Sequence, residues 1–588
     1  MAKTSSPRSD IRLWSKVGAW LVLFATVFMV GALPIMNDFM FNHYEVAVQD
    51  LVLPILGLVL IAAVLASIFY RLFRRRTMGG FIATLLTGVL LTNNYEGRLS
   101  SVYPIISAFT PLPRLDSIEG SVFSVIFMII IVAAAWWVGK LADAWIKRHN
   151  WNARDIVVGL LIAVSLTFVI VASPTVKTIA QAWPQYFYKP PQLQSNATAT
   201  GNKPDIYYIV MEDYANQTQL TNQFGFTNGA FSDFLTQAGY YLNPNAHQNY
   251  PYTTMSIAST LNAGYNTNLI NKFAGAKSQT IIPYHRAIQY SSVAQEFKNL
   301  GYQYDEIGTW YETTNRGPIA DNFYLNDRRL ILFGHTTYID GYTQQELSQS
   351  LFWRFLENGV SLGGKTVARY AGEGQVQLTG DALGDLKGLV DQPAGGRFIF
   401  AHLIIPHEPY YFNADGSLSA TPGTDNTGQP IKQKYVDQLQ YINSQIEPIL
   451  TSIKEHSNGQ AVVILQSDEG PQPQALNDHD YDQDSENDEI NNQDMRQWDN
   501  DDINLKYGTM VAYNIPGVSP TDLASGANNL DVFRLVLDHY FDAGMPFLPE
   551  CYYAFPNGRG QTFVYDDITQ RVAGAANPAC SSNGTDPK

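Results

Sequence analysis

Long apolar runs dominate the first third of the chain, and they constrain its fold more than any other feature. An α-helix needs ~20 predominantly apolar residues to cross a bilayer. Four runs approach that length, namely Val17–Met36, Leu51–Phe73, Gly120–Val138 and Asp155–Ala172. A fifth run, Phe81–Thr92, is shorter, and its length alone indicates a re-entrant or interfacial segment. The sequence therefore predicts that this part of the protein lies in a membrane.

Basic residues between the runs give the predicted orientation. They form three groups: Lys3, Arg8, Arg12 and Lys16; Arg71, Arg74, Arg75 and Arg76; and Lys140, Lys147, Arg148 and Arg154. The positive-inside rule places all three groups in the cytoplasm, which requires an odd number of crossings and makes Phe81–Thr92 a crossing too. We predict a transmembrane domain of five helices in residues 1–173 of a multi-pass plasma-membrane protein. Its N-terminus is cytoplasmic and the chain after Ser173 is extracytoplasmic. The uninterrupted first run is typical of an anchor, not of a removed signal peptide.

After the membrane segments, the composition changes to that of a linker and then to that of an α/β domain. Residues 174–203 are predicted to be a linker, because Trp183–Lys203 is rich in Pro, Gln, Asn and Thr. Alternating strand and helix patterns from Pro204 onward indicate an α/β domain with a mostly parallel central sheet. The predicted strands are Pro204–Tyr214, Tyr302–Ile307, Arg397–Ile405, Ala461–Leu465 and Thr509–Tyr513, and the predicted helices are Phe231–Ala238, Ser291–Leu300, Tyr435–His456 and Leu530–Phe541. We assign residues 204–545 to this domain and 546–588 to a C-terminal tail.

Charge and cysteine content limit the partners and the compartment. The net charge is −15, and Asp478–Asp502 contributes two thirds of it with 11 acidic residues and one arginine. The sequence has no basic stripe with interleaved aromatic residues, so we expect no nucleic-acid partner. Both cysteines, Cys551 and Cys580, lie in the predicted tail. This favours one disulfide in an oxidising compartment, and two unrelated thiols are the alternative.

The acidic segment Asp478–Glu489 carries side chains at the spacing of an EF-hand calcium loop. Gln483, however, stands where such a loop has the glycine of its turn, and flanking helices are not evident. We therefore predict a solvated acidic loop, with loose calcium binding as the alternative.

Acidic and imidazole side chains gather at the ends of three predicted strands. They are Glu212 and Asp213, Asp468 and Glu469, and His402 and His407. Ligands collect at the carboxyl ends of strands in parallel α/β sheets. Carboxylates and imidazoles that meet there can coordinate a divalent metal. The alternative is structural, because acids after a strand often cap a helix and a single histidine is often only hydrogen-bonded.

A threonine-rich segment, Asn249–Leu261, offers a nucleophile. Thr253 and Thr254 follow Pro251, where a loop is predicted to enter a helix. A hydroxyl at a helix N-terminus lies where the helix dipole favours an approaching phosphate. A nearby metal would lower its pKa and activate it. An ordinary capping threonine is the alternative.

These motifs together resemble the alkaline phosphatase/sulfatase superfamily. The shared order is a strand ending in an acid, a Thr-rich turn, a His-Pro-aromatic segment, a helix, and a strand ending in Ser-Asp-x-Gly. With its five predicted helices, the chain looks most like the membrane-anchored branch of lipoteichoic acid synthases and lipid A phosphoethanolamine transferases. The resemblance implies that Glu212 is the first metal ligand and that Thr253–Thr254 is the region of the catalytic threonine. It also implies that Asp468-Glu469-Gly470 corresponds to the family's Asp-His-Gly, and that His402 or His407 matches its histidine before the Pro-aromatic pair.

Two positions depart from the pattern of that superfamily. Glu469 stands where the family has a metal-binding histidine, which adds negative charge and favours hard cations. An alignment of the phosphodiesterase type through Tyr250-Pro251 would put Asn249 at the nucleophile position, and asparagine cannot attack. The Cys/Ser-x-Pro-x-Arg context of sulfatases that use formylglycine is absent, so we expect phosphate rather than sulfate esters as substrates.

The residues and the resemblance together predict a metal-dependent transferase or hydrolase for phosphate esters of cell-envelope lipids or glycans. We expect a membrane lipid or lipid-linked substrate and an envelope glycan or lipid acceptor. The assigned residues are Thr253, Thr254, His402 and His407 for catalysis, and Glu212, Asp213, Asp468 and Glu469 for a divalent metal (Mn²⁺, Mg²⁺, Ca²⁺ or Zn²⁺). The alternative is a degenerate, non-catalytic sulfatase-like protein that serves as an envelope binding or scaffolding module.

Overall fold

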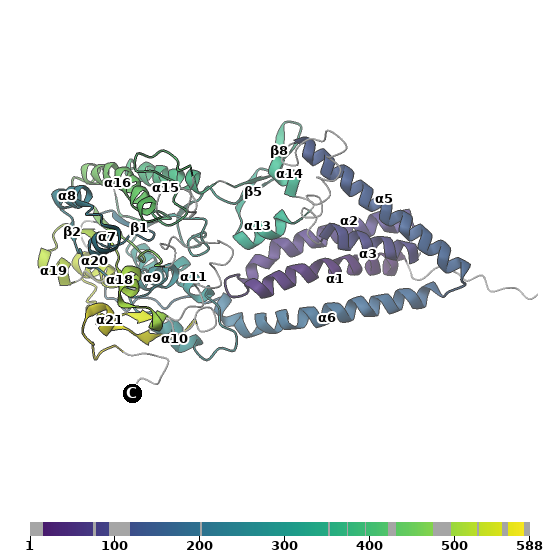
Figure 1. Ribbon diagram of the computed structural model, residues 1–588, viewed down its shortest axis with the longest axis horizontal. Coiled ribbons are helices and arrows are strands. Elements are labelled where there is room, and N and C mark those ends of the chain that lie inside the picture. The colour runs from purple at the N-terminus through teal and green to yellow at the C-terminus, as the bar shows by residue number, and fades with distance from the viewer. Residues whose placement is uncertain are drawn as a thin grey trace, which may run out of the picture. The chain divides into compact units, whose positions relative to one another are not determined.

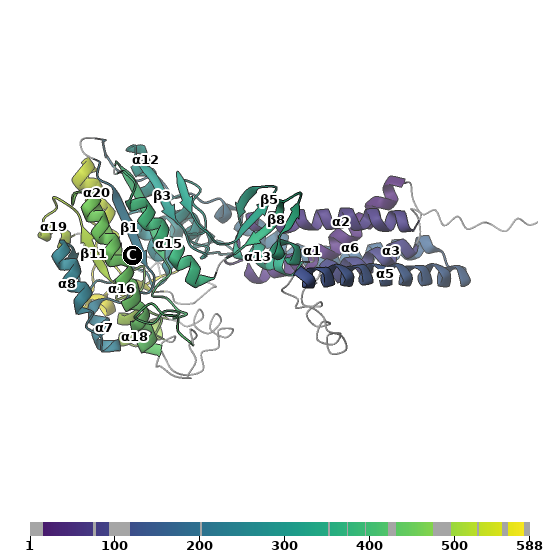
Figure 2. The same cartoon turned by 90° about the horizontal axis from the view of Figure 1, so that it is seen from above.

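The chain forms two compact units, which are drawn in Figures 1 and 2. The computed structural model describes residues 16–73, 78–92, 118–199, 203–350, 353–372, 374–393, 395–420, 431–473, 495–525, 529–554 and 562–580. Unit 1 comprises Met1–Gln181 and Arg328–Gly372, and unit 2 comprises Ala182–Asp327 and Glu373–Lys588. The predicted acidic loop Asp478–Glu489 lies outside the described residues.

Five helices of unit 1 arise from the apolar runs. They are α1 (Lys16–Asn42), α2 (Val52–Leu72), α3 (Met78–Thr92), α5 (Ile118–Arg148) and α6 (Ala153–Tyr186). All but α3 are long and apolar enough to cross a membrane. The described residues thus hold four helices of full crossing length, one fewer than the predicted five, because α3 has only 15 residues. Helix α6 continues to Tyr186, so the first part of the predicted linker 174–203 is helical.

Helices α3 and α5 approach each other closely at a pair of glycines. A Cβ atom on Gly79 of α3 would lie 2.2 Å from the carbonyl oxygen of Gly139 of α5. The backbone N–H of Gly79 also donates a hydrogen bond of 2.7 Å to Oδ1 of Asp143. Small residues at such a crossing let two membrane helices pack backbone to backbone.

Residues 328–372 form an insertion that belongs to unit 1, although the sequence analysis placed them in the domain 204–545. Its elements are β5 (Arg329–Leu332), β6 (His335–Tyr338), α13 (Gly341–Ser348), α14 (Trp353–Asn358), β7 (Val360–Leu362) and β8 (Lys365–Ala371), and the strands form an antiparallel sheet in the order β6-β5-β8-β7. Helix α13 packs beside α1 and α2 (Figure 1). The Tyr342 hydroxyl donates to the carbonyl of Ile35 at 2.8 Å, and Thr343 Oγ1 donates to that of Asp50 at 3.1 Å.

Unit 2 is built on a seven-stranded sheet in the order β2-β11-β10-β1-β9-β3-β4. The strands are β1 (Ile206–Met211), β2 (Tyr241–Leu242), β3 (Gln303–Ile307), β4 (Asn322–Tyr324), β9 (Arg397–Leu403), β10 (Val462–Gln466) and β11 (Val511–Asn514). Strands β10, β1, β9, β3 and β4 are parallel, β11 runs antiparallel to β10, and the edge strand β2 pairs antiparallel with β11. The predicted α/β class and mostly parallel sheet are confirmed.

Both faces of this sheet are covered by helices. Along β1, Tyr208 and Val210 belong to one buried cluster, whereas Tyr207 and Ile209 belong to another. The first cluster includes α9 (Thr253–Thr260), α11 (Ile282–Gln289), α12 (Ser292–Asn299) and α20 (Val532–Phe541), and the second includes α7 (Gln217–Phe224), α8 (Gly229–Ala238), α15 (Gln375–Val390) and α16 (Ile431–His456). Figure 2 shows α20 and α15 on opposite sides of β1. The continuous apolar run of β1 is explained by this burial on both faces.

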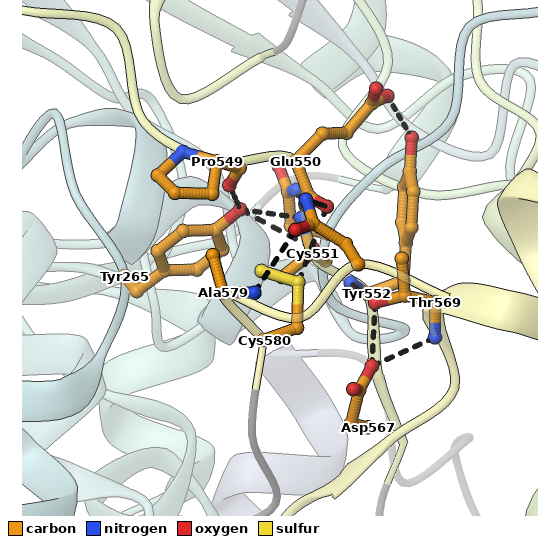
Figure 3. The surroundings of a disulfide bond; sticks show 11 residues. Tyr265, Pro549, Glu550, Cys551, Tyr552, Asp567, Thr569, Ala579 and Cys580 are labelled. Atoms are coloured by element: carbon orange, nitrogen blue, oxygen red, sulfur yellow. Dashed lines mark hydrogen bonds between the residues drawn. A yellow bond between two sulfur atoms is a disulfide. The ribbon is translucent and has the colours of Figure 1, made fainter. Parts of the chain in front are cut away.

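The predicted disulfide, Cys551–Cys580, is present and closes a loop within the C-terminal segment of unit 2. Its elements are β12 (Tyr553–Ala554), β13 (Asp566–Asp567) and α21 (Thr569–Ala573), and α21 packs against α18 (Asn500–Tyr507). Figure 3 shows the Tyr265 hydroxyl beside the disulfide. It accepts from the Cys551 N–H at 2.8 Å and donates to the Pro549 carbonyl at 2.5 Å. The Cys551 carbonyl accepts from Asn249 Nδ2 at 2.8 Å, so this segment also holds the loop that precedes α9.

Candidate active site

Three neighbouring strands bring polar side chains to one edge of the sheet. Strand β1 pairs in parallel with β9 and with β10, and Val210 is in register with both His402 and Gln466. The residues that follow β1 and β10 therefore emerge at the same edge, where ligands gather in parallel sheets. The predicted acid pairs, Glu212–Asp213 and Asp468–Glu469, lie close enough there to repel one another.

An inner cluster consists of Glu212, His402 and Asp468, all buried. Each of them offers one ligand atom, and these atoms lie within 4.8 Å of one another. Glu212 Oε2 is hydrogen-bonded to His402 Nε2, and the other ring nitrogen of His402, Nδ1, is 2.9 Å from Thr314 Oγ1. The imidazole is thus fixed at both nitrogens, so His402 can orient Glu212.

The hydroxyl of Thr253 lies directly against the acids. Thr253 is the first residue of α9, and its Oγ1 is 2.6 Å from Glu212 Oε1 and 3.3 Å from Glu469 Oε1. Thr254 points elsewhere, with its Oγ1 2.9 Å from Thr313 Oγ1. Asn249, the alternative occupant of the nucleophile position, donates to the Cys551 carbonyl instead. Of the hydroxyls that the sequence offered, the structure brings Thr253 to the acids and turns Thr254 away.

A buried lysine that the sequence analysis missed completes the site. Lys506 of α18 lies with Nζ 3.0 Å from Glu469 Oε1 and 3.9 Å from Asp213 Oδ1, and it donates to the Gly470 carbonyl at 3.1 Å. The only sequence signal is a lysine between the apolar neighbours Leu505 and Tyr507, just before a buried strand. Lys506 neutralises part of the charge of the acid pairs.

An outer cluster consists of Asp213, His407 and Glu408. His407 Nε2 is 3.8 Å from Asp213 Oδ2, and its Nδ1 is 3.7 Å from Glu408 Oε2. The two predicted histidines therefore have different places, His402 in the inner cluster and His407 in the outer one. Asp213 has a left-handed backbone with φ of 58°, which is uncommon for a residue other than glycine and turns the chain directly after β1.

The charges of the site shift its proton affinities strongly. Burial raises the pKa of Glu212, but the adjacent His402, His407 and Thr253 outweigh this effect and lower the pKa to about 2. Burial and the charges of Glu212 and Glu469 raise the pKa of Asp468 well above its ordinary value. Burial also raises the pKa of Glu469 to about 7, although Lys506 opposes the shift.

The pKa of the His407 imidazole is raised, which favours its positively charged form. Burial lowers the pKa of the His407 imidazole, but the negative charges of Glu408, Asp213 and Glu212 raise it by a larger amount. The resulting pKa is about 10. At neutral pH, His407 is therefore positively charged.

The donor set of the inner cluster suits a divalent cation. It offers two carboxylates and one imidazole, which Zn²⁺ and Mn²⁺ both accept, with a hydroxyl beside them. Asp468 Oδ2 and Glu469 Oε2 are buried and, within the described part of the chain, have no hydrogen-bond partner. Buried oxygens of this kind call for an ion or water. For His402 to act as a ligand, it would have to exchange its bond to Glu212 for one to the metal.

Comparisons with known proteins give one family match and several distant structural similarities. The family model described as Sulfatase matches residues 204–526, which is more than half of the chain. The C-terminal periplasmic domain of EcEptC from Escherichia coli is 11% identical, with 65% of this chain and 97% of that one covered and a TM-score of 0.38. The periplasmic domain of phosphoethanolamine transferase EptC from Campylobacter jejuni is 12% identical, with 61% and 94% covered and a TM-score of 0.34. Ps i-CgsB in complex with k-i-k-neocarrahexaose is 14% identical, with 59% and 73% covered and a TM-score of 0.34. No curated protein matches the sequence.

Proposed function

Because this chain belongs to the sulfatase family, we propose that unit 2 is the extracytoplasmic catalytic domain of a membrane-anchored enzyme that transfers or hydrolyses phosphate esters of cell-envelope lipids or glycans. The observation that carries this proposal is the position of Thr253 Oγ1, 2.6 Å from Glu212 and 3.3 Å from Glu469 at the start of α9. The disulfide Cys551–Cys580 and the basic residues between the membrane helices support the extracytoplasmic location. A membrane lipid or lipid-linked molecule is the donor, and an envelope glycan, lipid or water is the acceptor.

In the first step, Thr253 attacks phosphorus. A bond forms between Oγ1 and phosphorus, and the bond from phosphorus to the donor oxygen breaks. We assign Glu469 as the acceptor of the hydroxyl proton, since its Oε1 lies 3.3 Å away and its pKa is raised to about 7, whereas the pKa of the nearer Glu212 is lowered to about 2. The donor oxygen leaves as an alcohol after it takes a proton from water.

In the second step, an acceptor hydroxyl or water displaces Oγ1 from phosphorus. Oγ1 then recovers its proton from Glu469, and the acceptor proton passes to solvent. His407, which is cationic at neutral pH, and Lys506 place positive charge beside the reacting phosphate. A divalent metal held by Glu212, His402 and Asp468 would supply charge neutralisation and a lower pKa for the hydroxyl.

A second candidate function is a non-catalytic envelope scaffold. The ion pair between Lys506 and Glu469 favours it, because it occupies an oxygen that a metal would otherwise use. This candidate predicts that the protein binds metal weakly and forms no covalent intermediate.

Mass spectrometry of the full chain distinguishes the two functions. The protein is incubated in liposomes of phosphatidylethanolamine and phosphatidylglycerol with Mn²⁺ or Zn²⁺, quenched in acid and digested. The enzyme proposal predicts a phosphate-linked group on the peptide that contains Thr253. Thr253→Val should abolish the modification, whereas the matched control Thr254→Val should retain it, because Thr254 does not face the acids. An unmodified wild-type peptide under every condition would support the scaffold.

A further inference from the structure

A cavity in unit 1 lies between membrane helices α1 and α2 and helix α13 of the insertion. Its apolar wall includes Pro34 and Ile35 of α1 and Leu58 of α2. Gly57 keeps the α2 side open, since a Cβ atom there would meet nothing within 4 Å. The opposite wall is formed by α13 and includes Glu346. The cavity thus joins the apolar surface of two membrane helices to a carboxylate.

Glu346, which lines this cavity, is paired with a second carboxylate, that of Asp38. Asp38 of α1 and Glu346 share a hydrogen bond. Glu346 Oε1 is buried and, among the residues that the structure describes, has no hydrogen-bond partner. Burial and the charge of Asp38 raise the pKa of Glu346 to about 7. Two acids this close share a proton, and a positive group that binds beside them can take the place of that proton.

We propose that this cavity is a resident-lipid site for a phospholipid whose headgroup carries an ammonium group. The ammonium lies against Glu346, beside the Asp38 carboxylate, and the apolar part of the lipid lies against Pro34, Ile35 and Leu58. An ammonium donates three hydrogen bonds, which can satisfy Glu346 Oε1 and the Asp38 carboxylate together.

The location of the cavity favours a membrane lipid over a soluble amine. It lies near the C-terminal end of α1 and the N-terminal end of α2, both of which are long enough to cross a membrane. Headgroups lie at the ends of membrane-crossing helices in either leaflet, so the argument does not depend on the orientation of the chain. The proposal concerns unit 1 and does not depend on catalysis at Thr253.

Native mass spectrometry of the delipidated full chain in detergent tests this site. Phosphatidylethanolamine and phosphatidylglycerol with identical acyl chains are titrated separately, and soluble ethanolamine serves as a headgroup without chains. We expect phosphatidylethanolamine to bind at least tenfold more tightly than phosphatidylglycerol. Glu346→Gln should remove that preference. The control Glu357→Gln, at an exposed acid of the same insertion, should retain it.

The variant Gly57→Leu tests the apolar wall of the cavity separately from its charged groups. The new side chain would enter open space and block the apolar wall while both carboxylates stay in place, so phosphatidylethanolamine binding should fall at least tenfold. Equal affinities for the two lipids in the wild type would overturn the proposal, as would identical behaviour of Glu346→Gln and Glu357→Gln. Binding of soluble ethanolamine as tight as that of the lipid would also overturn it, because the apolar wall would then contribute nothing.

Discussion

Replacement of Lys506 by methionine removes a buried positive charge that touches Glu469. The Nζ–Oε1 distance is 3.0 Å, which at an effective dielectric constant of about 20 corresponds to about 5 kcal/mol of Coulomb energy. Deletion of one partner from a buried ion pair costs about 3–5 kcal/mol. We therefore expect Lys506→Met to lower the opening free energy of unit 2 by about 3–5 kcal/mol at pH 8 in the absence of divalent metal.

The cost should be smaller at pH 5. Burial raises the pKa of Glu469 to about 7, so at pH 5 the carboxyl group is mostly protonated and needs the lysine less. The folded pKa lies above the ordinary value of 4.5, so the contribution of Glu469 to stability is complete below about pH 4.5 and is lost as the pH rises to about 7. Lys506 lowers the pKa of Glu469, so in Lys506→Met the loss of this contribution to stability should continue to a higher pH.

Hydrogen exchange of the backbone amides of β1 and β10 measures the opening free energy in the detergent-solubilised full chain. Lys387→Met, which removes an exposed cation from α15, is the matched control and should change it by less than about 0.5 kcal/mol. Added Mn²⁺ should restore much of the loss if the acids hold a metal. Equal effects of the two substitutions, or a cost for Lys506→Met that does not change with pH, would refute the electrostatic reasoning.

Three further predictions test other parts of the structure. The disulfide Cys551–Cys580 closes a loop with a sequence separation of 29, so Cys551→Ser should destabilise the C-terminal segment by about 3–4 kcal/mol, measured by hydrogen exchange of its amides. Burial raises the pKa of the Glu306 carboxyl group to about 8, so the folded protein binds a proton there more tightly than the unfolded chain does. The free energy of unfolding should therefore fall as the pH rises from about 4.5 to about 8, and it should fall less in Glu306→Gln. Gly79→Leu should separate α3 from α5, because even a Cβ atom at position 79 would clash with the Gly139 carbonyl. Limited proteolysis should then cut unit 1 of this variant faster than unit 1 of Gly57→Ala, where the added methyl group enters open space.

Much of the fold could be predicted from the sequence because its signals are local. The apolar run Pro204–Tyr214 became the central strand β1, and the helical stripe at Tyr435–His456 became α16. The convergence of Glu212 with Asp468 followed from one rule, that parallel strands end at the same edge. The insertion 328–372 was not foreseen, because its short strands and helices look like the α/β alternation around them and its packing on α1 and α2 is a long-range property.

The details of the site depended on three-dimensional register. Spacing alone could not tell which of Thr253 and Thr254 faces the sheet, because both follow the loop into α9. Lys506 is distant from Glu469 in the sequence, and only the packing of α18 brings the two together. The role of Glu469, as metal ligand or as proton acceptor, remains a prediction.

The central claim is that Glu212, Asp468 and Thr253 surround one cation. Anomalous diffraction from crystals of the full chain soaked in Mn²⁺ tests it most directly, because it locates the ion itself. We predict a peak within about 2.0–2.3 Å of carboxylate oxygens of Glu212 and Asp468, with Thr253 Oγ1 facing it. No peak, or a peak bound only by Asp213, His407 and Glu408, would contradict the account.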